Sequence, residues 1–173
     1  MRLTKGFSLL ELLIVVAIIL IIAAIAIPNL LESRIAANES SAAGSLHTLT
    51  SAEITYYNAY PTVGYAPSIG LLGGASPCTP SSTTACIIDN FLATATPGGT
   101  GKSGYYYLAT GSVTGGATFN DAYVIGAAPI SMQYSGNRDF CSVSDGVLRS
   151  QMGSPGDTPV NVVATCLNYP VAQ

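Results

Sequence analysis

The fold of this chain is decided by the stretch "KGFSLLELLIVVAIILIIAAIAIP", which runs from Lys5 to Pro28. Between Phe7 and Ile27 it holds 21 residues, of which one is charged, Glu11. As an α-helix this segment is about 31 Å long, which matches the hydrocarbon thickness of a bilayer. The stretch therefore predicts a membrane-spanning helix that keeps a carboxylate in its first turns.

The energetics of insertion permit Glu11 but give no reason for it. Fifteen of the 21 residues are Phe, Leu, Ile or Val, and each favours insertion by roughly 0.3–0.6 kcal/mol at the helix centre. A charge at the centre costs roughly 2.5–3.5 kcal/mol, and less near the helix end. Insertion is therefore favourable with the carboxylate in place, and another role must explain its presence.

The helical pattern continues beyond the apolar stretch, through residues 29–60. Apolar residues recur at steps of three, four or seven and build one face: Leu31, Ile35, Ala42, Leu46, Leu49, Ala52 and Tyr56. The charged residues of this part are expected on the remaining surface: Glu32, Arg34, Glu39 and Glu53. A cleaved secretory signal has a shorter apolar run and a small-residue junction. We therefore expect one helix, apolar all round over residues 7–28 and amphipathic over residues 29–60.

Pro28 lies where the helix changes character. Proline has no backbone N–H, so the carbonyl of Ala24 loses its helical partner, and we expect a kink or a loosened turn there. The neighbouring residues Ala23 and Ala26 are small, which would let another helix approach closely.

These features together resemble the N-terminal signature of type IV pilins and the related pseudopilins. The matching features are a short basic leader that ends at Gly6, then Phe7, then Glu11 four residues later, and an unbroken apolar run up to Pro28. The resemblance is close over about Thr4–Leu31 and extends to the rest of the chain only in layout.

The resemblance implies how the N-terminus is processed and how the chain assembles. Residues 1–6 would be a leader that a membrane-bound prepilin peptidase removes by cutting between Gly6 and Phe7, after which the Phe7 amine is methylated. In a filament, Glu11 would pair with the Phe7 amine of a neighbouring subunit within the dry helical core. Pairing lowers the cost of a buried carboxylate, and one buried polar residue can fix a register. Glu11 and Pro28 are therefore the expected assembly residues.

The resemblance also gives the expected function, a structural subunit of a type IV pilus that acts in adhesion, motility or DNA uptake. Its partners would be further copies of itself in a helical homopolymer, the prepilin peptidase and the pilus assembly machinery. It would cross the bacterial inner membrane once before assembly and then lie in an extracellular filament. One alternative is a pseudopilin of a type II secretion system, which forms a periplasmic filament. The other is a non-polymerising, membrane-anchored periplasmic binding module.

The remainder of the chain changes from loop-like to strand-like composition. Gly, Ser, Thr and Pro are frequent in residues 61–103, where we expect a surface connection with a short helix around Ile87–Thr94. Strand-like runs follow at Gly104–Thr110 and Asp121–Ala128, and two more flank Asp145-Gly146, a strong hairpin signal. The predicted fold class is α+β and pilin-like, with the long helix packed on an antiparallel sheet of about four strands. Residues 104–173 comprise this sheet and a C-terminal loop, which we expect to be irregular.

Four cysteines follow the membrane segment: Cys78, Cys86, Cys141 and Cys166. None forms a CxxC pair and the single histidine, His47, is distant in sequence, so no metal site is predicted. An even count behind a membrane-targeting segment favours disulfides. Of the three pairings we choose Cys78–Cys86 and Cys141–Cys166, because each closes a local loop and fits the layout. The second also resembles the pilin habit of tying a C-terminal loop to the sheet.

The composition argues against several classes of function. The net charge is -3 and there is no tryptophan, so a direct nucleic-acid site is not predicted. The residues Gly99–Gly104 fit a GxGxxG pattern, but they lead into a strand where a dinucleotide site needs a helix. We find no partnered nucleophile, no carboxylates paired so as to perturb each other and no metal triad. The chain is therefore expected to be neither an enzyme nor a cofactor protein.

Overall fold

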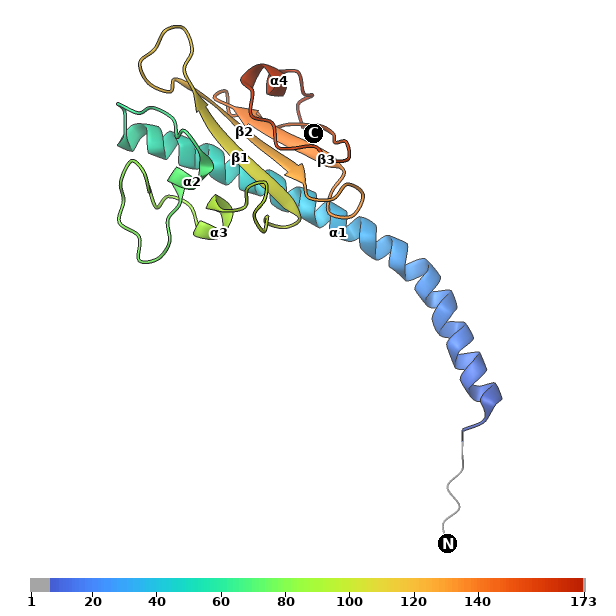
Figure 1. Cartoon of the computed structure of the whole chain (residues 1–173). Coiled ribbons are helices and arrows are strands. Elements are labelled where there is room, and N and C mark those ends of the chain that lie inside the picture. Colours follow the sequence, from blue (N-terminus) through green and yellow to red (C-terminus); the bar gives the residue numbers. More distant parts are fainter. Residues whose placement is uncertain (1–6, 173) are drawn as a thin grey trace. The chain divides into compact units, whose positions relative to one another are not determined.

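The computed structural model describes residues 7–172, so Gly6 and the rest of the predicted leader lie outside the described residues. The chain divides into two compact units between Arg34 and Ile35. The longest element is helix α1, Leu9–Ala59, which begins in the first unit and supplies the first element of the second (Figure 1). The predicted long N-terminal helix is therefore present.

In the first unit, α1 continues past Pro28. Asn29 Nδ2 donates a hydrogen bond to the carbonyl oxygen of Ile25 at 3.1 Å, and Ser33 Oγ donates to the carbonyl oxygen of Asn29 at 2.8 Å. These side chains supply donors to helix carbonyls next to a residue that lacks its own N–H. The kink expected at Pro28 stays a prediction.

The second unit is built on one antiparallel sheet whose strands lie in sequence order. The strands are β1 Tyr105–Ser112, β2 Ala122–Pro129, β3 Arg138–Val143 and β4 Arg149–Met152. All four were predicted, together with the hairpin between β3 and β4. Gly146, in that hairpin, has a φ of 70°, which glycine adopts at little cost.

One face of this sheet packs on the part of α1 that belongs to the same unit. Alternate residues of β1 and β2 face the helix, because side chains of a strand point to opposite sides in turn. The contacts that form this core are Ala42, Leu46, Leu49, Ala52 and Tyr56 of α1 with Tyr105, Tyr107, Tyr123, Ile125 and Ala127 of the sheet. The predicted α+β, pilin-like arrangement is confirmed.

Glu53 corrects one prediction about α1, since it is buried rather than on the outer surface. Its side chain is 0% exposed. Oε2 accepts a hydrogen bond from the N–H of Ala66 at 2.8 Å, and Oε1 has no partner in the described chain. Burial raises the pKa of Glu53 to about 8, against the opposing effect of the Ala66 bond. Glu53 lies four residues after Leu49 and three before Tyr56, so it shares their helix face.

Residues 61–103 were expected to be a surface connection with a short helix around Ile87–Thr94, and several of their apolar side chains are buried instead. The segment contains α2 Ile69–Leu72 and α3 Asn90–Ala93, the latter within the range predicted for a short helix. Its apolar residues complete the core: Ala66, Ile69, Leu72, Ile88, Leu92, Ala93 and Ala95. They have no regular period, and so no helix or strand pattern revealed that they are buried.

The opposite face of the sheet is covered by the C-terminal segment, which holds α4 Val163–Leu167 (Figure 1). The tail is therefore more regular than expected. A second apolar cluster joins it to the sheet: Val124, Cys141, Val143, Cys166 and Tyr169. The four-stranded sheet thus lies between α1 on one face and the C-terminal segment on the other.

Candidate functional site

The start of α1 is capped by the side chains of Ser8 and Glu11. The Ser8 N–H donates to Oε2 of Glu11 at 3.0 Å. In return, Ser8 Oγ accepts a hydrogen bond from the N–H of Leu10 at 3.3 Å. A serine before the first turn and a glutamate three residues later form the capping pattern that satisfies free N–H groups at a helix start. In the single chain, Glu11 therefore acts as a cap on its own helix.

The residues around this cap form an apolar surface that the first unit leaves open. Phe7 is 81% exposed. The other large exposed apolar side chains include Leu9, Leu12, Leu13, Val16, Ile19, Leu20, Ile22, Ile25 and Ile27. The helix is long and apolar enough to cross a membrane, and its apolar part is not buried in the described chain. An apolar surface of this extent marks contact with lipid or with other protein.

Three of the predicted processing and assembly residues belong to the described part of this first unit. Phe7 and Glu11 stand at the start of α1, and Pro28 lies inside it with its side chain exposed. Gly6 lies outside the described residues. The amine expected to pair with Glu11 belongs to a second copy of the chain, so that pairing stays a prediction. Ser8 was missed, although Ser8 and Glu11 fit the Ser-x-x-Glu capping pattern that would have revealed it.

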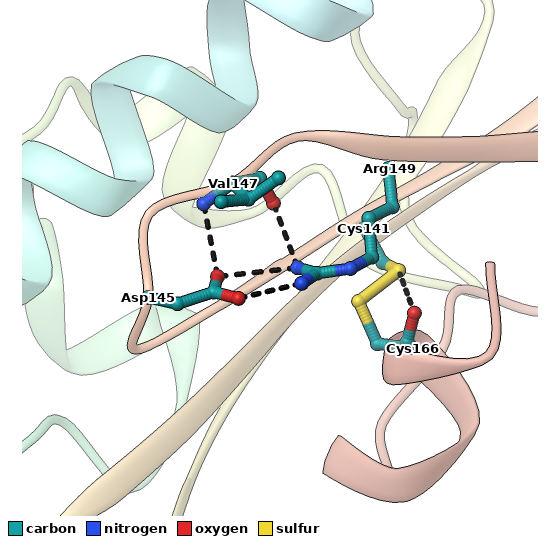
Figure 2. The surroundings of a disulfide bond; sticks show 5 residues. All are labelled: Cys141, Asp145, Val147, Arg149 and Cys166. Atoms are coloured by element: carbon teal, nitrogen blue, oxygen red, sulfur yellow. Dashed lines mark hydrogen bonds and ion pairs between the residues drawn. A yellow bond between two sulfur atoms is a disulfide. The ribbon is translucent and has the colours of Figure 1, made fainter. Parts of the chain in front are cut away.

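The predicted cysteine pairs are both joined in the structure. The sulfur atoms of Cys141 and Cys166 are 2.07 Å apart, and this disulfide ties β3 to α4 (Figure 2). Both of these cysteines are fully buried. The disulfide Cys78–Cys86 closes a short loop beside the core. The phenol of Tyr56 donates to the carbonyl oxygen of Ser82 in this loop at 2.6 Å, which fastens the loop to α1.

Beside the buried disulfide, Arg149 lies opposite Cys141 in the pairing of β3 with β4. Its guanidinium donates to both carboxylate oxygens of Asp145, at 2.6 and 3.1 Å, and to the carbonyl oxygen of Val147 (Figure 2). The hydrogen bonds from Arg149 lower the pKa of Asp145 below its usual value. This ion pair stabilises the hairpin between β3 and β4, and it uses both carboxylate oxygens of Asp145.

A pair of carboxyl groups corrects the expectation that none would perturb each other. Asp139 of β3 and Asp157 of the C-terminal segment line one hollow, and burial first and Asp157 next raise the pKa of Asp139. They are 18 residues apart in sequence, so their spacing gave no signal. Within residues 7–172, no three His, Cys, Asp or Glu side chains gather as a metal site would need.

Comparisons with known proteins find a family motif and curated relatives. Residues 1–27 match the family described as "Prokaryotic N-terminal methylation motif". The chain is 62% identical over 40 residues to the "Type IV wide pilus major component PilA4" of Thermus thermophilus, which covers 23% of this chain and 30% of the relative. It is 38% identical over 73 residues to the "Type IV major pilin protein PilA" of Myxococcus xanthus, which covers 38% of this chain and 33% of that relative.

These matches confirm the predicted resemblance to type IV pilins. The chain spans about a third of the length of these curated relatives. No solved structure matches.

Proposed function

We propose that this chain is a structural subunit of a type IV pilus and that it polymerises through the first part of α1. The observation that carries the proposal is the exposed apolar surface from Phe7 to Leu31, which contains one carboxylate, Glu11. The methylation motif on residues 1–27 and the pilins among the relatives support it. The role is structural, and no catalytic step is assigned to the chain.

Before assembly, this part of α1 lies in the inner membrane as a single span. Prepilin peptidase removes residues 1–6, and the assembly machinery then draws the helix out of lipid. Lipid tails are as apolar as the helix, so association depends on close packing and on polar contacts rather than on the hydrophobic effect. Small residues such as Ala23 and Ala24 allow that packing, and Glu11 supplies the polar contact.

The polar contact favours the filament over the membrane. In lipid, an ionised Glu11 costs free energy that the cap from Ser8 only partly offsets. In a helical core, the amine of a neighbouring Phe7 can partner the same carboxylate. Each subunit then contributes one positive and one negative group near the same level of the helix, and the axial register that pairs them is preferred.

The proposal is tested by deleting the gene and examining the cell surface. Cells with the wild-type chain should carry filaments that an antibody to residues 35–173 decorates along their length in electron micrographs. The deletion should remove these filaments, and the wild-type gene should restore them. If wild-type cells carry no surface filaments and the deletion stops protein secretion, the chain is instead a pseudopilin. If the deletion changes neither surface filaments nor protein secretion, the proposal is overturned and a membrane-anchored binding module is the remaining alternative.

A further inference from the structure

The side chain of Asp139 is a carboxyl group buried on the sheet face that the C-terminal segment covers. Asp139 lies on β3 beside Phe140, whose side chain points to the α1 core on the opposite face. The residue is 3% exposed, and its Oδ1 has no hydrogen-bond partner in the described chain. A side chain placed at Gly153 would put its Cβ 2.9 Å from this oxygen. Oδ1 of this carboxyl group is therefore buried without a hydrogen-bond donor among the described residues.

The group that faces Asp139 is another acid, Asp157. The two residues line a common hollow and lie within hydrogen-bonding reach of each other. Oδ2 of Asp157 accepts a hydrogen bond from the N–H of Ser154 at 2.5 Å, which holds the side chain in a tight turn. Two neighbouring carboxylates repel each other, whereas a carboxylic acid and a carboxylate can share one proton in a hydrogen bond.

The segment that carries Asp157 has few other fastenings. Across residues 154–161, the described hydrogen bonds join Ser154 and Asp157 to each other and none joins the segment to the sheet. The backbone of Val160 lies directly over Gly126 of β2, where a Cβ would come within 2.3 Å of the Val160 carbonyl oxygen. Val160 also packs on the second apolar cluster. The carboxyl pair is thus the polar link between this segment and the sheet.

Neighbouring elements offer the pair no positive charge in the described chain. On β3, Arg138 is paired with Glu39 of α1 at 3.9 Å. On β4, the residue opposite Asp139 is Gln151, which is neutral. The charge of Asp139 also acts on the phenols of Tyr105 and Tyr169, which are neutral when protonated.

The remaining two elements add no partner. The titratable residue of β2 is Tyr123, which belongs to the α1 core, and that of α4 is Cys166, which is in a disulfide. Burial first, and the hydrogen bond and charge of Asp157 next, raise the pKa of Asp139 to about 7.

We propose that Asp139 and Asp157 share one proton and so form a latch that holds residues 154–161 on the sheet and releases them when both groups ionise. The protonated Asp139 donates to the Asp157 carboxylate in the closed state. When the proton leaves, the buried charge of Asp139 faces the charge of the exposed Asp157, and the segment moves away so that water can hydrate Asp139. The disulfide Cys141–Cys166 keeps the rest of the C-terminal segment in place.

The direction of the pH dependence follows from the raised pKa of Asp139. Between about pH 4 and pH 7 the closed state holds a proton that an open, hydrated Asp139 would have lost. Closure therefore weakens as the pH rises through this range, and it changes little above it. The latch is closed in mild acid and open in mild alkali.

Hydrogen exchange of the full mature chain in detergent micelles tests the latch. Mass spectrometry of the peptide covering residues 154–161 is compared at about pH 5.5 and about pH 8.5, with each rate divided by the unfolded-chain rate at that pH. Wild type should lose protection about tenfold or more at the higher pH. Asp157→Asn should keep its protection, because an amide donates permanently to Asp139 and still accepts from Ser154.

Two controls make the result decisive. Asp145→Asn removes one carboxylate outside the hollow and should retain the wild-type loss of protection. Asp139→Asn provides a second locked variant that should match Asp157→Asn. Wild-type protection that is the same at both pH values would overturn the latch, as would pH-dependent loss that persists in both locked variants. Wild type at the higher pH is also measured with calcium chloride and with a chelator. Protection that calcium chloride restores and the chelator removes would assign the hollow to a cation and contradict the shared proton.

Discussion

The backbone N–H of Ser8 donates a hydrogen bond to Oε2 of Glu11, with 3.0 Å between nitrogen and oxygen. Glu11 thus has a partner within its own chain before any neighbour arrives. A carboxylate near a helix N-terminus is favoured by the free N–H groups and by the helix dipole. Under the proposed function, the amine of a second subunit is a further partner for a carboxylate that already caps its own helix.

We expect Glu11→Leu to leave cleavage and membrane insertion intact and to reduce filament yield severely. Leucine inserts more favourably than glutamate, but it provides neither the cap nor a partner for the Phe7 amine. Glu11→Gln should also reduce the yield, because the amide can accept the Ser8 bond but carries no charge. Precursor and mature protein in the membrane fraction, and sheared filaments, are compared by immunoblot.

The matched control for this experiment is Glu32→Gln, which removes an exposed carboxylate from the same helix. It should assemble normally. Normal filament yield from Glu11→Leu would eliminate the pairing role. If Glu11→Leu instead blocked cleavage, Glu11 would belong to recognition by the processing machinery.

The two disulfides should contribute unequally to stability. Removing Cys141–Cys166 with a double serine variant should cost about 3.5 kcal/mol, and removing Cys78–Cys86 about 2.6 kcal/mol, because the larger loop restricts the unfolded chain more. The first pair is also fully buried between β3 and α4. Thermal unfolding of the two double variants in the same detergent measures the difference. Equal losses, or crossed pairs in non-reducing peptide maps, would contradict this account.

Glu53 should make the fold less stable as the pH rises. Its pKa is raised from 4.5 to about 8 by burial, so between these values the folded state holds a proton that the unfolded chain has lost. Stability then falls by up to about 1.4 kcal/mol per pH unit from this group. Glu53→Gln should match wild type near pH 4 and exceed its stability near pH 8. Denaturant unfolding measures the free energy of unfolding across this pH range, with Glu32→Gln as the exposed control. The same pH dependence of stability in Glu53→Gln and Glu32→Gln would disprove the effect.

The elements with a regular period could be predicted from sequence. Leu46, Leu49 and Tyr56 recur at helical steps, and the alternation in β1 places Tyr105 and Tyr107 on one face. Asp145-Gly146 located a hairpin through its turn chemistry alone. In each case the signal lies within a few residues of sequence, which is the range over which local patterns act.

The features that sequence did not reveal depend on contacts between distant residues. Glu53 is buried because the N–H of Ala66 meets it from another segment. Asp139 and Asp157 line one hollow only because the C-terminal segment packs on β3. The glutamate at position 53 satisfies a backbone donor inside the core, so a rule that places charges outside fails there. Ser8 differs from these, because its capping pattern was readable and was overlooked.

The central claim is that this chain, cleaved before Phe7, is the bulk subunit of a filament, and the intact mass of purified sheared filaments tests it most directly. We expect one dominant species that begins at Phe7, carries one methyl group on its amine and lacks four hydrogens because of two disulfides. Replacing Gly6 with a bulky residue should leave uncut precursor in the membrane and no such species. Filaments dominated by a different protein, or assembled subunits that retain residues 1–6, would contradict the account.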